Sequence, residues 1–93
     1  MSNAIQTSQV PTLNNLYRMQ WEESQDSWVL LYPEGMVQLN GSAGEIMAQV
    51  DGVRTVADII AVLETKFPEA GDLSADIVEF IGVAHEHDWI EFN

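Results

Sequence analysis

Apolar residues follow a period of two in the first half of the chain, which predicts strands. Alternation runs from Tyr17 to Glu22, a nearly unbroken apolar run covers Trp28 to Tyr32, and alternation returns from Met36 to Leu39. Pro33-Glu34-Gly35 separates the last two runs with residues that favour a tight turn. We therefore expect a three-stranded antiparallel meander whose apolar middle strand is at least partly covered on both faces.

The apolar period changes to 3.6 after Ser42, which predicts helices. Ser42 and Glu45 have the spacing of a capping box, and Asp51-Gly52 ends the first helix. Thr55 is the expected cap of the second helix, and Pro68 ends it. The expected buried stripe of that second helix consists of Val56, Ile59, Ile60, Leu63 and Phe67.

A third helix is expected to begin at Ser74. Its central apolar stripe is Ile77, Ile81 and Ala84, flanked by Phe80 and Val83 on one side and by Val78 on the other. This apolar arc exceeds about 200°, wider than a helix needs to face one core, so the helix has apolar surface to spare. Alternation resumes from Trp89 to Phe92, which predicts a short segment packing back on the domain.

The remaining sequence limits the chain to one small domain. Residues 1–13 are polar and lack apolar periodicity, so we expect a disordered tail, and Ser2-Asn3-Ala4 has the composition of an expression scar. Residues 14–93 then form a single domain. Three strands followed by three helices, the last two of helix-turn-helix length, predict an α+β, winged-helix-like fold.

Charge restricts the partners of such a fold. The chain carries fifteen Asp or Glu against three Lys or Arg, a formal net charge of -12. The helix expected at Ala75 to His87, where a winged helix usually reads DNA, has no Lys or Arg. We therefore expect no binding to nucleic acid or to anionic membranes. The excess acid either keeps the protein in solution or matches a basic protein partner. Without a signal peptide or a long apolar span, the cytoplasm is the expected location.

No residue cluster predicts catalysis, a cofactor or a metal. His85 and His87 are two positions apart, so on a helix they point about 200° from each other and cannot chelate one ion together. If the helix has already ended there, they could bind a metal loosely with Glu86 and Asp88, but histidines at a helix end are the better interpretation. Asp72 and Asp76 lie one helical turn apart without a nearby base, which favours a solvated cap region. Ser74 likewise has the position of a cap. We expect a protein that is not an enzyme.

The strand from Met36 to Leu39 has no further strand after it in the sequence. It is therefore a candidate open sheet edge, with unpaired backbone donors and acceptors that can accept another strand. Most open edges bind nothing, and a wide apolar helix is more often core than a binding surface. The residues alone leave both interpretations open.

An ordered set of residues resembles a known family, protein D of pyrroloquinoline quinone biosynthesis. The resemblance runs from about Pro11 to Trp89 and has no single decisive motif. Its residues are Trp28-Val29-Leu30-Leu31-Tyr32-Pro33-Glu34-Gly35, Leu39-Asn40 with Ala43 and Ile46, and Asp51-Gly52-Val53-Arg54-Thr55-Val56 with Ile59-Ile60.

The resemblance implies a small, non-catalytic peptide chaperone with a winged-helix fold. Such a protein binds the short precursor peptide of the cofactor and presents it to a radical S-adenosylmethionine enzyme, which cross-links a Glu and a Tyr within it. In related recognition domains the peptide adds as a strand beside the third strand and packs on the third helix. The corresponding residues here are Met36, Val37, Gln38, Leu39, Asn40, Ile77, Phe80, Ile81 and Ala84.

One alternative function comes from a different class. A winged-helix module of this kind can also contact an intact, folded protein without binding any free peptide. Open edges can pair with each other, so the expected state is a monomer or a weak homodimer.

Overall fold

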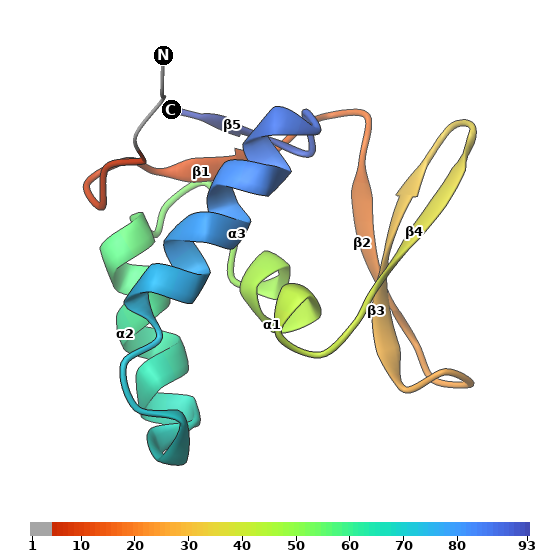
Figure 1. The fold of residues 1–93 in the computed structure, drawn as a ribbon. Helices are drawn as coiled ribbons and strands as arrows, with labels where there is room; N and C mark the ends of the chain where they lie inside the picture. The colour runs from red at the N-terminus through yellow and green to blue at the C-terminus, as the bar shows by residue number, and fades with distance from the viewer. Residues whose placement is uncertain (1–4) are drawn as a thin grey trace.

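A three-stranded antiparallel sheet forms one side of the molecule (Figure 1). This computed structural model describes residues 5–93. The strands are β2 (Arg18–Glu22), β3 (Ser27–Tyr32) and β4 (Gly35–Leu39), in the spatial order β2-β3-β4. The predicted meander and its α+β class are confirmed.

The register of the sheet gives it two different faces. Trp28 lies opposite Trp21 and Leu39, so these three side chains point to the same face. The rings of Trp21 and Trp28 meet edge to face at 5.5 Å between centroids. Val29 and Leu30 point to opposite faces, yet both are 0% exposed. The middle strand is therefore covered on both sides, as its apolar run predicts.

Within the described residues, three α-helices and a short 3-10 helix follow the sheet along the chain. They are α1 (Ser42–Ala48), α2 (Val56–Lys66), η1 (Pro68–Ala70) and α3 (Ser74–Glu86). Of these, α1 packs on β3 and β4, and the core that the sheet shares with the helices consists of Leu30, Leu39, Ile46, Met47, Val56, Ile59, Leu63, Ile77, Ile81, Ala84 and Ile90. Within residues 5–93, no helix has the length and hydropathy that crossing a membrane requires.

The helix caps agree with the sequence at one helix and differ at another. The Thr55 side chain accepts a hydrogen bond from Asp58 N, and the Asp58 side chain accepts one from Thr55 N, so α2 begins with a capping box. The predicted capping box of Ser42 and Glu45 is wrong. The N-cap of α1 is Gly41, which makes no side-chain hydrogen bond, because the cap lies one residue earlier than the pattern suggests. Glu45 instead pairs with Lys66 at 2.9 Å.

Phe67 also departs from the expected buried stripe of α2. The helix ends at Lys66, and Phe67 is its C-cap with φ -125° and ψ 69°. Because Phe67 no longer has helical geometry, its side chain leaves the buried stripe and is 38% exposed. Pro68 follows as the first residue of η1, which explains why the helix cannot continue.

The two ends of the chain pair in a second, two-stranded sheet. Here β1 (Pro11–Leu13) runs antiparallel to β5 (Ile90–Phe92), with Thr12 opposite Glu91. The segment expected from Trp89 to Phe92 thus forms β5. The sequence places residues 11–13 in a disordered tail, whereas the structure forms a strand there, and residues 1–4 with the suggested scar lie outside the described part of the chain.

Backbone hydrogen bonds explain why the segment before β1 is ordered. The carbonyl oxygens of Thr7 and Gln9 accept hydrogen bonds from Ala57 N and Val56 N in the first turn of α2. Those N–H groups have no partner within their own helix. This polar segment without apolar periodicity therefore packs on the domain through backbone hydrogen bonds, which the side-chain pattern does not reveal, together with the side chain of Ile5.

Candidate functional site

The first part of the site is the outer edge of β4. Among residues 5–93, β4 pairs only with β3. Tyr32 and Gly35 flank the two-residue turn Pro33-Glu34, in which Pro33 has no N–H. Tyr32 and Gly35 therefore form the hydrogen-bonded type of antiparallel pair. Alternation along the strand then directs the N–H groups of Met36 and Gln38 outward. The edge therefore offers donors and acceptors to a further strand.

A sharp bend connects this edge to α1. Gly41 has φ 48° and ψ -118°, a backbone conformation that side chains with a Cβ rarely adopt. The bend lets the chain pass from β4 into α1 with only Asn40 and Gly41 between them. Gly41 and Ser42 also line a cavity, so the edge of the sheet and the cavity are continuous along the chain.

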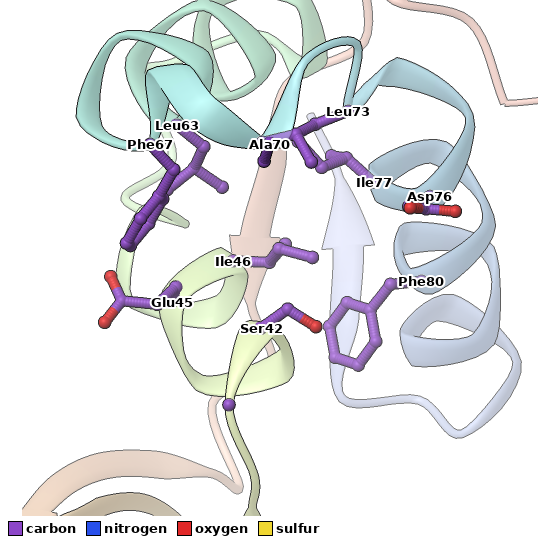
Figure 2. Close-up of a pocket in the computed structure, with 11 residues that line it drawn as sticks. Ser42, Glu45, Ile46, Leu63, Phe67, Ala70, Leu73, Asp76, Ile77 and Phe80 are labelled. Carbon is purple, nitrogen blue, oxygen red and sulfur yellow. The ribbon is translucent and has the colours of Figure 1, made fainter.

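The second part of the site is this cavity, of about 520 Å³, between the helices (Figure 2). Its walls come from the start of α1, from the end of α2 with η1, and from the first half of α3. The lining residues are Gly41, Ser42, Glu45, Ile46, Leu63, Phe67, Ala70, Leu73, Asp76, Ile77 and Phe80. Most of these side chains are apolar, so the cavity suits an apolar group.

Hydrogen bonds fix the wall that α3 provides. The Asp72 carboxylate accepts from Ser74 N at 2.9 Å and from Ser74 Oγ at 2.7 Å. These bonds hold the pKa of Asp72 below its ordinary value. Leu73 N donates to Glu64 Oε2 at 2.8 Å, which ties the start of α3 to α2. Leu73, not Ser74, is the N-cap, so the expected role of Ser74 as a cap is wrong.

The residues predicted for the site fall into two groups. Met36 to Asn40 form the open edge and the residue that follows it, and Met36 is 52% exposed. On α3, Phe80 lines the cavity and is partly buried. Ile77 lies at its wall but is almost fully buried, while Ile81 and Ala84 belong to the core and are absent from the lining. The structure therefore places Phe80 at the cavity with Gly41 and Ser42, which follow the β4 segment along the chain, and leaves Ile81 and Ala84 in the core.

Most of the cavity walls that α1, α2 and η1 supply are not predicted by the sequence pattern. Ser42, Glu45, Ile46 and Phe67 were assigned to caps or buried stripes. The only sequence signal for Phe67 is the following Pro68, because a residue at which the helix must end no longer points its side chain along the helical stripe.

The two histidines have local packing roles. The ring of His85 packs on Phe92 and that of His87 on Trp89, at 4.8 and 5.0 Å between ring centroids.

The arrangement of strands and helices matches a solved structure. It is the solution NMR structure of the PqqD truncation of Methylobacterium extorquens PqqCD, described as a functional and stand-alone recognition element for ribosomally synthesized and post-translationally modified peptides. The two chains share 28% identity with a TM-score of 0.75, and the match covers 95% of each. The winged-helix-like fold is therefore shared with a peptide-recognition domain.

Sequence comparison identifies the family. The profile described as "Coenzyme PQQ synthesis protein D (PqqD)" matches residues 27–90. A "PqqA binding protein" of Stutzerimonas stutzeri is 51% identical over 94% of this chain and 95% of its own length. A protein of the same description from Acinetobacter baylyi is 50% identical over 97% of this chain and 89% of its own length. The chain belongs to the coenzyme PQQ synthesis protein D family.

Proposed function

We propose that this protein binds PqqA, the precursor peptide of pyrroloquinoline quinone, as an added strand beside β4. The observation that carries the proposal is the continuity between the open edge of Gly35–Leu39 and the apolar cavity beside it. The relatives described as PqqA binding proteins support the choice of peptide. The protein acts as a chaperone without chemistry of its own.

An added strand would use both parts of the site at once. Its backbone pairs with the N–H and C=O groups of Met36 and Gln38. Its residues opposite Val37 and Leu39 point to the same face as those side chains, which is the face that packs on the helices. A side chain of the peptide just beyond Leu39 then lies next to Gly41 and Phe80, at the cavity.

The expected affinity is moderate. Backbone pairing and burial of one or two apolar side chains favour binding, while ordering a flexible peptide costs roughly 2 to 5 kcal/mol. The net free energy is therefore about -8 kcal/mol, which corresponds to a micromolar Kd. Such an affinity suits a protein that must release its peptide to an enzyme.

An amide NMR titration with the synthetic PqqA peptide of Stutzerimonas stutzeri tests the site. We expect the largest shift changes between Gly35 and Ser42 and around Phe80. Changes confined to β2, or to the outer surface of α2, would contradict strand addition at β4. Absence of any change at millimolar peptide would contradict peptide binding itself and would favour a module that contacts a folded protein.

The proposed chaperone role has its own test. The purified protein should leave PqqA at unchanged mass, because no catalytic set was identified among its residues. Adding the radical S-adenosylmethionine enzyme of the pathway should give the cross-linked peptide, and adding this protein should increase its yield. Equal yield with and without this protein would contradict delivery, even if the peptide binds.

A further inference from the structure

The charged residues around the cavity are not equivalent. Glu45 and Asp76 lie on opposite sides of it, with apolar side chains between them (Figure 2). Lys66 is 2.9 Å from Glu45 and balances its charge. Asp76 is exposed, and within residues 5–93 it takes part in no salt bridge and no side-chain hydrogen bond. One rim of the cavity is therefore neutralised, and the other keeps a free negative charge.

Asp76 also has a structural role to consider. It occupies the first turn of α3, where the positive end of the helix dipole favours an acidic side chain. This effect explains why an acidic residue is tolerated there. It does not require the carboxylate to lie beside an apolar cavity, and Asp72 already anchors the start of α3 through Ser74.

We propose that Asp76 makes the site selective for a peptide segment in which a Lys or Arg lies next to the apolar side chain that enters the cavity. This inference rests on the proposed function. The apolar stem of Lys or Arg can lie along the cavity rim near Phe80 while the charged head stays in water beside Asp76. An acidic residue at the same position would be repelled by Asp76, and the net charge of -12 acts in the same direction.

The expected effect is modest because both charges would remain in contact with water. A pair of this kind changes affinity about two- to fivefold at low salt. Screening reduces it as the ionic strength rises, since the Debye length falls from about 30 Å at 0.01 M to about 8 Å at 0.15 M. The experiment must therefore distinguish the contribution of this local pair to affinity from the general attraction between an acidic protein and any basic peptide.

Matched variants of the full chain make that distinction. Asp76→Asn removes the proposed charge, Asp76→Glu keeps it, and Glu86→Gln removes an equal charge ten residues further along α3, about 15 Å away along the helix axis. The probes are the Stutzerimonas stutzeri PqqA peptide and versions of it in which each Lys or Arg is replaced singly by Gln. Calorimetric Kd values are measured at low and high salt, and thermal unfolding checks that each variant is folded.

We expect Asp76→Asn to weaken binding about two- to fivefold at low salt, with Asp76→Glu and Glu86→Gln close to the unchanged protein. Replacing one particular Lys or Arg of the peptide by Gln should weaken its binding to the unchanged protein by the same factor. The same peptide replacement should cause no further weakening when the protein carries Asp76→Asn. Equal losses for Asp76→Asn and Glu86→Gln would overturn the inference in favour of net charge alone. Tight binding without any effect at Asp76 would overturn this inference and leave the proposed function intact, whereas no binding by the unchanged protein would overturn both.

Discussion

The three-stranded sheet has two outer edges, on β4 and on β2. One hollow begins at Gly41, two residues after the end of β4, and another includes Arg18 of β2. Both strands pair only with β3 within the described residues. The hollow near β2 is formed by Asn15–Arg18 and Leu31–Pro33, and its volume of about 490 Å³ is close to the 520 Å³ of the other. Neither an open edge nor the size of a hollow therefore distinguishes the two sides.

The walls of the hollows do distinguish them. Beside β4, three helices and η1 supply apolar walls, and Gly41 connects the strand to them. Beside β2, the walls are strand ends and turns, with Leu16 64% exposed and Arg18 at the surface. In the proposed binding mode, a peptide that continues past β4 would meet the apolar cavity, whereas a peptide on β2 would meet strand ends and turns.

The largest effect is expected from proline in β4. Gln38→Pro removes an outward N–H and should weaken PqqA binding tenfold or more, about 1.4 kcal/mol, while the protein stays folded. Val37→Pro removes an N–H that pairs with β3 and should unfold the domain. Circular dichroism and calorimetry separate the two results. If folded Gln38→Pro binds PqqA as well as the unchanged protein, the β4 edge is not the site.

A second test loosens α1, which packs on β3 and β4. A Cβ at Gly44 would lie 3.1 Å from Trp28 Cδ1 and 3.4 Å from the Leu39 carbonyl oxygen. We expect Gly44→Ala to lower the free energy of unfolding by about 1 to 3 kcal/mol, measured with urea. Gly82→Ala is the control, because its Cβ has no neighbour closer than 3.8 Å. It should stabilise α3 by roughly 0.5 to 1 kcal/mol. Equal effects at both glycines would mean that α1 is not closely packed on the sheet.

Removing an apolar side chain from each hollow compares them directly. Phe80→Ala should weaken PqqA binding about tenfold, or 1.4 kcal/mol, because it enlarges and exposes the cavity. Leu16→Ala, beside β2, should leave the Kd unchanged. Phe80 also packs against Trp89 at 6.4 Å between ring centroids, so urea unfolding must confirm that the variant is folded. A larger loss with Leu16→Ala would move the site to the β2 side.

The smallest effect concerns acid. Hydrogen bonds from Ser74 lower the folded-state pKa of Asp72 below its ordinary value of 3.8. The ionised carboxylate therefore contributes stability that is present above pH 4 and is lost as the pH falls through the folded-state pKa. In Asp72→Asn, stability should fall less steeply below pH 4 than in the unchanged protein. Exposed Glu23→Gln, in the turn between β2 and β3, is the control. If the stability of Asp72→Asn and of the unchanged protein falls equally steeply below pH 4, the role of these hydrogen bonds is contradicted.

The sequence predicts those features that depend on neighbouring residues. Period-two alternation and the Pro33-Glu34-Gly35 turn give the meander and its open edge, and Ile77, Ile81 and Ala84 are buried as their spacing predicts. The predicted surplus of apolar surface on α3 is also present, since Val83 is 40% exposed. These features follow from local geometry, which a one-dimensional pattern records.

Features that depend on distant residues could not be predicted in this way. The three residues of β1 are too few to show a period, and their partner β5 lies at the other end of the chain. The cavity combines residues of α1, α2, η1 and α3, so no local pattern contains it. For the same reason a stripe on α3 could not tell Phe80, which lines the cavity, from Ile81, which the core covers completely.

The pairing of β1 with β5 also bears on how this domain can be attached to other proteins. Pro11 lies opposite Phe92, so the two ends of the domain leave it at nearly the same place, close to the start of α2 (Figure 1). An enzyme fused to either end would be tethered at one pole, and a flexible linker could join the ends in a circular permutant. Neither change would alter the strand order β2-β3-β4. The orientation of a protein fused at either end would therefore be set mainly by the linker.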